Sequence, residues 1–371
     1  MAEPSTSLNR HWASLDGIRA WALIFMLFYH FGRNLPKGGF LTIDMFFVLS
    51  GFLITSLLLG EREKRGVIRF GNFYARRALR LLPCIIAVLI FVTIASLVFG
   101  QRALSHQTLT TVPFTLFYVA NWVQAFGHVN QLGMLDHTWS LSLEEQFYLI
   151  WPTLLLGLLV VAKNRRRMLG VCLFFASLAD MGYRAFMVHH NAGFFRVYYA
   201  TDTHCDGLLM GCAIALWLAS RTKPLSEKMQ QLSKVAAYVG VVVLMVALFT
   251  FNPFFVSTYA VSIPIAVFAT SAIIVNLVTH PARGIDLVLG SKPLVWLGKR
   301  SYGFYLWHWP FYVIVTSYWK VHANRCDVTE LALACIAGTL SYKYLEEPFL
   351  RRKVRFQATE SMPSSFATAA E

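Results

Sequence analysis

The stretch LDGIRAWALIFMLFYHF, residues 15–31, is an apolar run that contains Arg19 and His30. Eleven residues are about three helical turns, so both side chains fall on nearly the same helix face, roughly 16 Å apart along the axis. A cation and an imidazole on a lipid-embedded helix are costly and usually face a bundle interior or a cavity. A signal-anchor helix with a basic flank and an interfacial histidine explains this stretch equally well.

The composition places the chain among helical membrane proteins. Of its 371 residues, 56% are apolar and only 14% are charged, which is too hydrophobic for an ordinary soluble protein. The net charge of +14 comes from short basic segments between apolar runs, a pattern of topology signals and anionic lipid contact rather than of nucleic-acid binding. The six cysteines form no C-x-x-C pair, so we expect no metal site.

Apolar runs of spanning length predict an all-α membrane bundle of about ten transmembrane helices. These runs lie at 15–31, 40–60, 81–99, 142–162, 168–187, 203–219, 235–251, 257–279, 301–319 and 330–346. Residues 1–14 are expected to form a cytoplasmic lead, and the small, polar residues 353–371 a disordered cytoplasmic tail.

Basic residues decide the expected topology. Segments 61–80 and 163–167 carry seven and four Lys or Arg residues, so the positive-inside rule puts both in the cytoplasm. An even number of crossings must separate them, and runs 81–99 and 142–162 supply two. The apolar segment 110–126 is therefore expected to be re-entrant or peripheral on the outer side. The same alternation along the rest of the chain puts both termini in the cytoplasm.

This topology collects carboxylates around one histidine in the outer half of the bundle. His30, Asp44 and Glu144 all fall toward the outer ends of their helices. A neutral imidazole held by a carboxylate can act as a general base on a hydroxyl or as a nucleophile. A histidine that is satisfied at the headgroup level is the alternative. Further along the chain, Asp180 and Arg184 lie four residues apart and predict an ion pair.

The cytoplasmic side carries arginines instead. The segment NFYARRALRLLP, residues 72–83, places Arg77 and Arg80 three residues apart on one helix face. Guanidinium groups bind phosphates bidentately. The cluster is either a plain topology signal or a site for a phosphate-bearing substrate that approaches from the cytoplasm.

Seven motifs occur in an order that resembles the acyltransferase 3 family of membrane-bound acyltransferases, over about residues 14 to 352. They are SLDGIRAWALIFMLFYH, GGFLTIDMFFVLSGFLIT, NFYARRALRLLP, HTWSLSLEEQFYLIWP, TDTHCDGLLMGCAIAL, LGKRSYGFYLWHWPF and YLEEPFLRR. The resemblance implies a ten-helix membrane domain at 15–352 in the bacterial plasma membrane. It also implies transfer of an acyl group, most often acetyl from acetyl-CoA, to a hydroxyl.

The family resemblance carries over to single residues. The basic-x10-His motif of the family falls on Arg19 and His30, and its R-x-x-R motif falls on Arg77 and Arg80. His30 would then be the essential histidine, and the three arginines would handle the acyl donor. We expect Asp44 or Glu144 to orient His30 or to hold the acceptor.

The remaining candidates concern the acceptor. The family's W-S-L-x-x-E motif covers Trp139 to Glu144, and aromatic rings there could stack on a sugar or macrolide. Where many relatives have an arginine two residues before the acid of the D-G-L-L-x-G motif, this chain has His204, which puts a charge pair at that acid in doubt. The expected acceptor-binding residues are Trp139, Ser140, Tyr148, Asp206 and His308, although packing in an aromatic belt is an alternative role for His308.

Three functions stay open at this stage. The first is O-acylation of a cell-envelope glycan or glycolipid, such as lipopolysaccharide O-antigen, exopolysaccharide or peptidoglycan, with acyl-CoA as a co-substrate and no permanently bound cofactor. The second is acylation of a macrolide-type metabolite, and the third is transport along the same charged path. Membrane lipid is an expected partner and nucleic acid is not, and the oligomeric state stays open.

Overall fold

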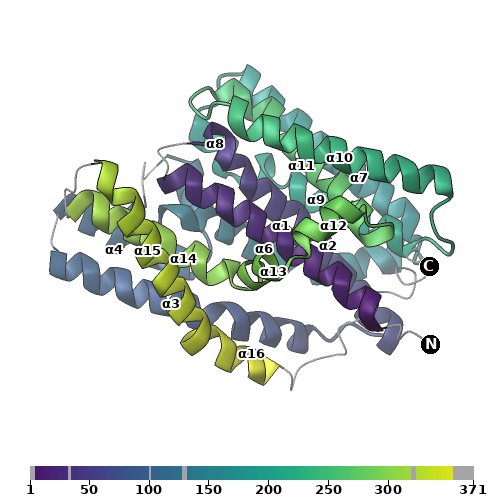
Figure 1. Ribbon diagram of the computed structural model, residues 1–371, viewed down its shortest axis with the longest axis horizontal. Helices are drawn as coiled ribbons and strands as arrows, with labels where there is room; N and C mark the ends of the chain where they lie inside the picture. Colours follow the sequence, from purple (N-terminus) through teal and green to yellow (C-terminus); the bar gives the residue numbers. More distant parts are fainter. Residues whose placement is uncertain (1–4, 32–34, 100–101, 128–131, 319–322, 354–371) are drawn as a thin grey trace.

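The computed structural model describes residues 5–31, 35–99, 102–127, 132–318 and 323–353, which are helical and contain no strand (Figure 1). The expected all-α fold is thus confirmed. Residues 1–4 of the expected lead and 354–371 of the expected tail lie outside the described residues. The helices on which the expected spans fall are α1 (Ser5–Phe31), α2 (Thr42–Arg65), α3 (Phe70–Phe99), α6 (Trp139–Val161), α7 (Arg166–His189), α9 (Asp206–Ala219), α10 (Glu227–Thr250), α11 (Val256–Thr279), α14 (Ser301–Tyr318) and α15 (Ala323–Ser341).

Shorter elements connect these helices. The short α-helices are α4 (Arg102–Leu116), α5 (Ala120–Ala125), α8 (Phe194–Tyr199), α12 (Arg283–Leu289), α13 (Lys292–Lys299) and α16 (Glu347–Lys353). Three 3₁₀ turns, η1 (Lys37–Leu41), η2 (Gly133–Thr138) and η3 (Thr201–Thr203), precede α2, α6 and α9, and one π-helical turn, η4 (Tyr342–Glu346), follows α15.

Six of the described helices have the length and apolar composition to cross a membrane, namely α2, α3, α6, α7, α10 and α11. Their outward faces are apolar: Leu97 on α3 is 69% exposed and Val161 on α6 is 83% exposed. Such wide apolar exposure is unfavourable in water and is satisfied by lipid tails. The chain is therefore a polytopic helical membrane protein.

The other four expected spans fall on α1, α9, α14 and α15. Helix α9 has only 14 residues and is buried along nearly its whole length among its neighbours. Ten crossings with both termini in the cytoplasm stay a prediction. Segment 110–126 is divided between α4 and α5 by a break at Tyr118, whose φ is 54°, and neither piece reaches the roughly 20 residues that a span needs.

Segments that the charge pattern assigns to the cytoplasm meet at one end of the bundle. Arg166 at the start of α7 bonds to Glu63 near the end of α2, and it also donates to the carbonyl of Ala219 at the end of α9 at 3.1 Å. Arg76 near the start of α3 lies 3.5 Å from Glu61. These contacts agree with the alternation that the positive-inside rule predicts.

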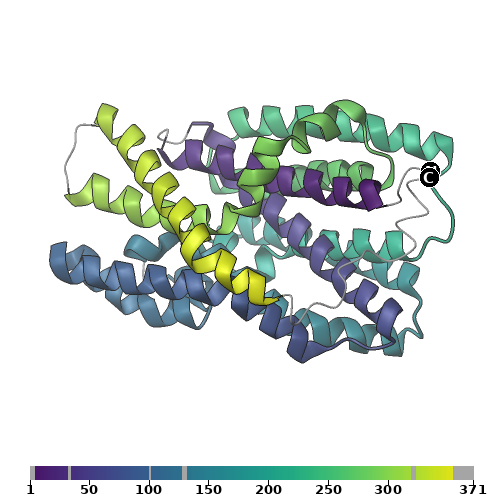
Figure 2. The same cartoon turned by 60° about the horizontal axis from the view of Figure 1, so that its bottom comes forward.

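The segments expected outside meet at the opposite end. Tyr198 on α8 donates to the carbonyl of Phe40 at 3.2 Å, and Asn121 on α5 donates to the carbonyl of Tyr199 at 3.2 Å. Figure 2 shows the long helices running between the two ends of the molecule.

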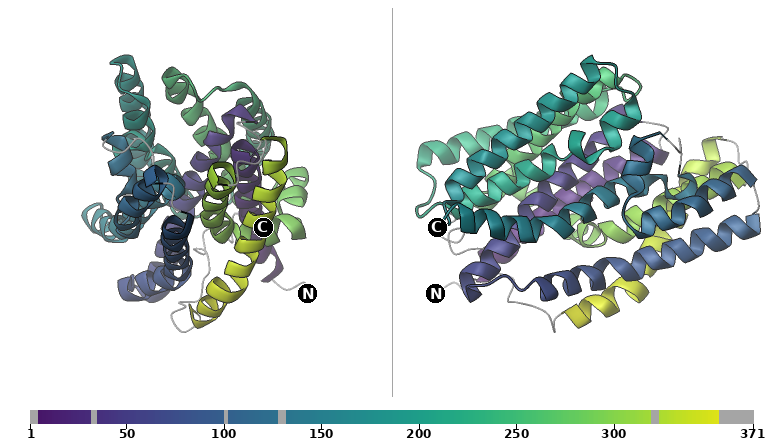
Figure 3. Two further views of the ribbon diagram at one scale, coloured as in Figure 1. Left: turned by 90° about the vertical axis from the view of Figure 1, so that its left-hand side faces the viewer. Right: turned by 180° about the vertical axis from the view of Figure 1, so that it is seen from behind.

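The bundle has two groups of helices, which the right-hand view of Figure 3 separates. Helices α2, α7, α9, α10 and α11 pack together in one group, and α3, α4, α14, α15 and α16 in the other. Helix α1 contacts members of both groups, and α6 packs on α2. The pockets described below lie where the two groups meet.

Glycines bring α2 and α9 unusually close. A Cβ on Gly211 of α9 would lie 2.1 Å from the carbonyl oxygen of Val48, and a Cβ on Gly51 of α2 would lie 2.1 Å from that of Leu208. Small residues allow this approach because helices in lipid associate largely through close van der Waals packing. The contact fixes the rotation of α2, and with it the direction of the side chains that line the site.

Gly211→Ala should destabilise the bundle, because the added methyl group meets backbone atoms on α2. Overpacking of this kind costs roughly 1–3 kcal/mol. Gly182→Ala on α7 is the matched control, since no atom lies within 4 Å of its Cβ position. Heating each variant in detergent and measuring the fraction that stays monodisperse checks the prediction. Equal melting of the two variants would contradict it.

Candidate active site

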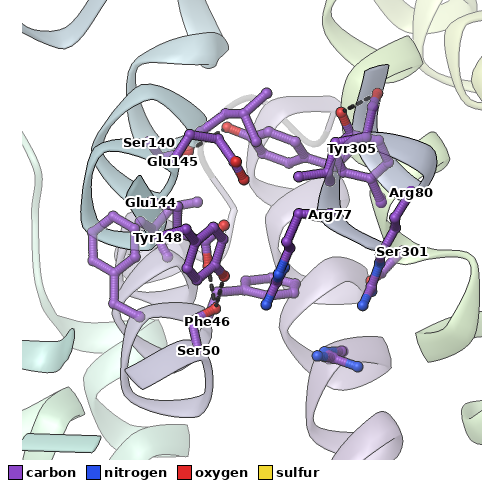
Figure 4. Close-up of a pocket in the computed structure, with 16 residues that line it drawn as sticks. Phe46, Ser50, Arg77, Arg80, Ser140, Glu144, Glu145, Tyr148, Ser301 and Tyr305 are labelled. Carbon is purple, nitrogen blue, oxygen red and sulfur yellow. Dashed lines mark hydrogen bonds between the residues drawn. The ribbon is translucent and has the colours of Figure 1, made fainter. Parts of the chain in front are cut away.

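Residues from five helices enclose the first pocket, which we call the arginine pocket. It contains Arg19 from α1, Arg77 and Arg80 from α3, and Glu144 and Glu145 from α6, and it encloses about 80 Å³. Figure 4 shows the two α3 arginines on one side and the α6 carboxylates on the other. The remaining lining residues are Ile43, Phe46, Phe47, Ser50, Leu81, Ser140, Leu141, Tyr148, Ser301, Tyr302 and Tyr305.

The three arginines differ in how they are held. Arg19 pairs with Asp16 one turn earlier at 2.9 Å. The guanidinium of Arg77 lies 3.9 Å from the ring centroid of Tyr148, a cation–π contact. No hydrogen bond or ion pair holds Arg80 among the described residues. Arg77 and Arg80 thus leave guanidinium donors available to an anion that enters the pocket.

The two carboxylates of the pocket face the arginines without forming close ion pairs. Glu144 accepts a hydrogen bond from Ser50 and lies 3.0 Å from the hydroxyl of Tyr148. Oε1 of Glu145 is buried and has no hydrogen-bond partner among the described residues. These two hydroxyl groups therefore hold Glu144 at the wall of the arginine pocket, and Glu144 does not line the pocket that contains His30. The expectation that Glu144 orients His30 does not fit this position.

A second pocket, which we call the histidine pocket, lies toward the end of the bundle that is expected to be outer. It encloses about 220 Å³ and contains His30 from α1 together with Asp136 and His137 from η2. Aromatic side chains form most of its wall, and they are Tyr29, Phe40, Trp139, Phe194, Tyr198, Tyr199, Tyr259, Tyr305 and Trp309.

Ile43 and Tyr305 line both pockets and form the boundary between them. The hydroxyl of Tyr305 donates to the carbonyl of His137, and the hydroxyl of Ser140 lies 2.6 Å away. Ile43 and Tyr305 are therefore shared by a pocket that contains three arginines and a pocket that contains a histidine.

His30 has a second histidine as its partner. Its Nδ1 lies 3.1 Å from Nε2 of His308 on α14, and the two rings are inclined by only 12°. Nδ1 of His308 contacts the carbonyl oxygen of Tyr305, one turn earlier on the same helix. Nε2 of His30 has no hydrogen-bond partner among the described residues, so it is available to a ligand in the histidine pocket.

Comparison with known proteins identifies the class of enzyme. The family model of the acyltransferase domain of type 3 matches residues 12–342. The chain belongs to the acyltransferase 3 family. The match includes every helix that lines the two pockets, and it makes the chain an acyltransferase. Together with the six membrane-length helices, it makes the chain an integral protein of the bacterial plasma membrane.

Curated relatives of this acyltransferase are bacterial. The chain is 34% identical over 350 residues to the peptidoglycan O-acetyltransferase OatA of Listeria monocytogenes, which covers 90% of this chain and 55% of that protein. It is 33% identical over 363 residues to YrhL of Bacillus subtilis, provisionally named a peptidoglycan O-acetyltransferase. This alignment covers 92% of this chain and 55% of YrhL. SAS0844 of Staphylococcus aureus, provisionally named an O-acetyltransferase, is 34% identical over 376 residues. This alignment covers 96% of this chain and 59% of SAS0844.

The chain thus spans little more than half the length of the relatives it matches. No solved structure matches the chain.

Asp44 lies apart from the histidine of this acyltransferase, contrary to the expectation that it orients His30. It is fully buried, its Oδ1 lies 3.0 Å from Nε2 of His204, and it lines neither pocket. The ring of His204 stacks on Trp139, with centroids 5.6 Å apart. Asp44 is thus linked to the wall of the histidine pocket through His204 and Trp139, and the carboxylate that lines this pocket is Asp136.

Asp206 also lies outside the two pockets, and its partner is Arg184. Arg184 forms two hydrogen bonds to the carboxylate, at 3.0 Å and 2.8 Å, and both side chains are fully buried. Asp180 instead accepts the backbone N–H of Asp206 at 3.0 Å. The expected Asp180–Arg184 pair is thus wrong. Asp206 does have a positively charged partner, which is Arg184 on α7 and not a residue at position 204.

The other expected acceptor residues are divided between the pockets. Trp139 lines the histidine pocket, whereas Ser140 and Tyr148 line the arginine pocket. His308 lies behind His30 and lines neither. Sequence reasoning missed Asp136, His137 and Tyr305. The motif HTWSLSLEE begins at His137, and Tyr305 precedes His308 by one helical turn, so both motifs contained an unused signal.

Proposed function

We propose that this acyltransferase moves an acetyl group from acetyl-CoA to a hydroxyl of peptidoglycan or a closely related cell-envelope glycan. The observation that carries the proposal is the shared boundary of the two pockets. Arg77 and Arg80, which have no close carboxylate partner among the described residues, line the pocket on one side of Ile43 and Tyr305. His30, whose Nε2 has no hydrogen-bond partner among the described residues, lines the pocket on the other side.

The arginine pocket suits the donor. Acetyl-CoA carries its phosphates at one end of a long, narrow arm and its thioester at the other. Arg77 and Arg80 offer guanidinium forks to the phosphates, and the arm then reaches toward Ile43 and Tyr305. The basic segments expected in the cytoplasm flank this pocket, where acetyl-CoA is available.

The histidine pocket suits a sugar. Aromatic rings stack on the apolar faces of pyranoses, and Trp139, Tyr198 and Tyr199 supply such rings at the wall. Asp136 accepts hydrogen bonds from the side chain of Gln124 at 2.6 Å and the backbone of Leu132 at 3.0 Å, which fixes its carboxylate beside the pocket. A fixed carboxylate can accept hydrogen bonds from sugar hydroxyls.

His30 supplies the chemistry in this proposal. Its Nε2 removes the proton of the acceptor hydroxyl, and the oxygen attacks the thioester carbonyl. The new C–O ester bond forms as the C–S bond breaks, and the imidazolium returns its proton to the departing CoA thiolate. Direct transfer of this kind requires both substrates to meet at the boundary between the pockets.

The relatives support the choice of acceptor. OatA is named for peptidoglycan, and YrhL is provisionally named for it. Peptidoglycan is therefore preferred to lipopolysaccharide O-antigen, exopolysaccharide or a macrolide. Because the chain spans about half of these proteins, the acceptor is the part of the proposal that most needs a direct test.

Reconstituted protein tests the function. Proteoliposomes receive acetyl-CoA with a labelled acetyl group, together with peptidoglycan fragments that have free sugar hydroxyls, and mass spectrometry follows the label. We expect an alkali-labile acetyl ester on the fragments and one free CoA for each ester formed. Label that crosses the membrane as unchanged acetyl-CoA would identify a transporter, and the absence of ester on every fragment would reject the proposed acceptor.

A further inference from the structure

The contact between His30 and His308 determines which nitrogen of His30 carries a proton. His308 is fully buried, and the rings around it belong to His30, Phe31, His137, Tyr305 and Trp309. No carboxylate contacts it among the described residues. Burial without a counter-charge favours the neutral imidazole, and a neutral imidazole carries one N–H.

The backbone fixes the tautomer of His308. A carbonyl oxygen only accepts hydrogen bonds, so Nδ1 of His308 must donate to the carbonyl of Tyr305. Nε2 of the neutral ring is then an acceptor. It lies 3.1 Å from Nδ1 of His30, which must therefore be the donor. His30 is left with its lone pair on Nε2, the nitrogen without a partner.

We propose that His308 is the positioning residue of His30. It holds the tautomer in which Nδ1 is protonated and Nε2 presents its lone pair to the histidine pocket. This inference rests on the function proposed above and deepens it, because a base with its proton on Nε2 could not accept the hydroxyl proton. His308 takes the place that a carboxylate holds in a Ser-His-Asp triad.

The arrangement also supports the charged stage of the reaction. When Nε2 of His30 takes the acceptor proton, the ring becomes an imidazolium, and its Nδ1–H bond to His308 becomes charge-assisted. The proton returns from Nε2 to the CoA thiolate, so the pair ends in its starting state. Tyr305, which bonds to His308 through its carbonyl, is also a boundary residue between the pockets. One turn of α14 therefore carries both His308, which contacts His30, and Tyr305, which lies at the boundary between the pockets.

Two substitutions at one position test the inference. The amide of glutamine reaches the place of Nε2 of a histidine, and the amide of asparagine reaches that of Nδ1. His308→Gln therefore keeps an acceptor for His30, whereas His308→Asn keeps only the donor to Tyr305. We expect His308→Gln to retain kcat within about tenfold and His308→Asn to lose roughly 100-fold or more, since a wrong tautomer is severely damaging in serine proteases. KM for acetyl-CoA should stay unchanged in both. Equal losses would overturn the proposal.

A spectroscopic readout does not depend on acyl transfer. In protein labelled with ¹⁵N-histidine, the signals of His30 are those lost in His30→Gln, and their shifts report which nitrogen is protonated. We expect protonated Nδ1 in the wild type and in His308→Gln, and mixed tautomers in His308→Asn. Protonated Nε2 in the wild type would overturn the proposal even if His308→Asn failed to fold. A failure of acetyl transfer with the expected tautomer would instead reject only the proposed function.

Discussion

Replacing His30 by glutamine should lower the kcat for acetyl transfer by roughly 100- to 10,000-fold, the range expected for the loss of a general base. Glutamine has a volume close to that of histidine, so α1 should keep its packing. KM for acetyl-CoA should change little, because His30 lines the histidine pocket and Arg77 and Arg80 line the other. Initial rates in proteoliposomes at varied acetyl-CoA concentration measure both constants.

His189→Gln is the matched control for this variant. His189 is an exposed histidine at the end of α7 and lines neither pocket, so its replacement should leave both constants unchanged. A His30→Gln protein that folds and keeps more than a tenth of the wild-type kcat would contradict the mechanism. An acetyl adduct on the His30 peptide of the wild type, trapped in the absence of acceptor, would replace the general-base step by a covalent one.

The sequence contained enough information to predict the helices and the grouping of Arg77 and Arg80 on one face of α3. Ten apolar runs fall on ten of the described helices, because a span needs many consecutive apolar residues and leaves a clear pattern in the sequence. Arg77 and Arg80 share a pocket because three residues on a helix fix their relative direction. Both conclusions depend only on local geometry.

The surroundings of His30 depend on the rotation of each helix, which a single sequence does not reveal. Asp44 and His30 were expected at similar depth, but the close packing of Gly51 and Gly211 turns Asp44 toward His204 on the α9 side. Position along a helix predicts depth, whereas the direction of a side chain depends on which neighbour the helix packs against. The expected carboxylate partner of His30 was misplaced for this reason.

Partners that are far apart in sequence were also missed. His30 and His308 are separated by 278 residues, and neither of their sequence motifs indicates that the two side chains are in contact. The same holds for Arg184 and Asp206, which come from α7 and α9. Without Arg184, the buried carboxylate of Asp206 would lack its counter-charge, a loss that typically costs 3–5 kcal/mol. Although this chain has His204 where many relatives have an arginine, Asp206 is still paired, because Arg184 on α7 supplies the guanidinium.

Arg80→Gln should raise KM for acetyl-CoA roughly 10- to 100-fold, because a hydrogen bond to a charged group contributes about 1.5–3 kcal/mol. Arg80 is chosen over Arg77 because the latter already packs on Tyr148, so its loss would also disturb the wall of the pocket. Arg167→Gln is the matched control. It removes one positive charge from an exposed position at the start of α7, outside both pockets.

A truncated donor separates phosphate binding from other roles of Arg80. An acetyl thioester of pantetheine keeps the reacting group and the narrow arm but lacks the nucleotide phosphates. If Arg80 binds those phosphates, wild-type protein and Arg80→Gln should use this donor with equal kcat/KM, and the difference between the proteins should appear only with acetyl-CoA. An equal loss with both donors would mean that Arg80 shapes the pocket or its field rather than holding the nucleotide. The fold-loss in kcat/KM that Arg80→Gln causes with acetyl-CoA, divided by the fold-loss that it causes with the truncated donor, is a double-mutant cycle between one guanidinium and the phosphates. This quotient measures the contact on which the donor half of the proposal depends.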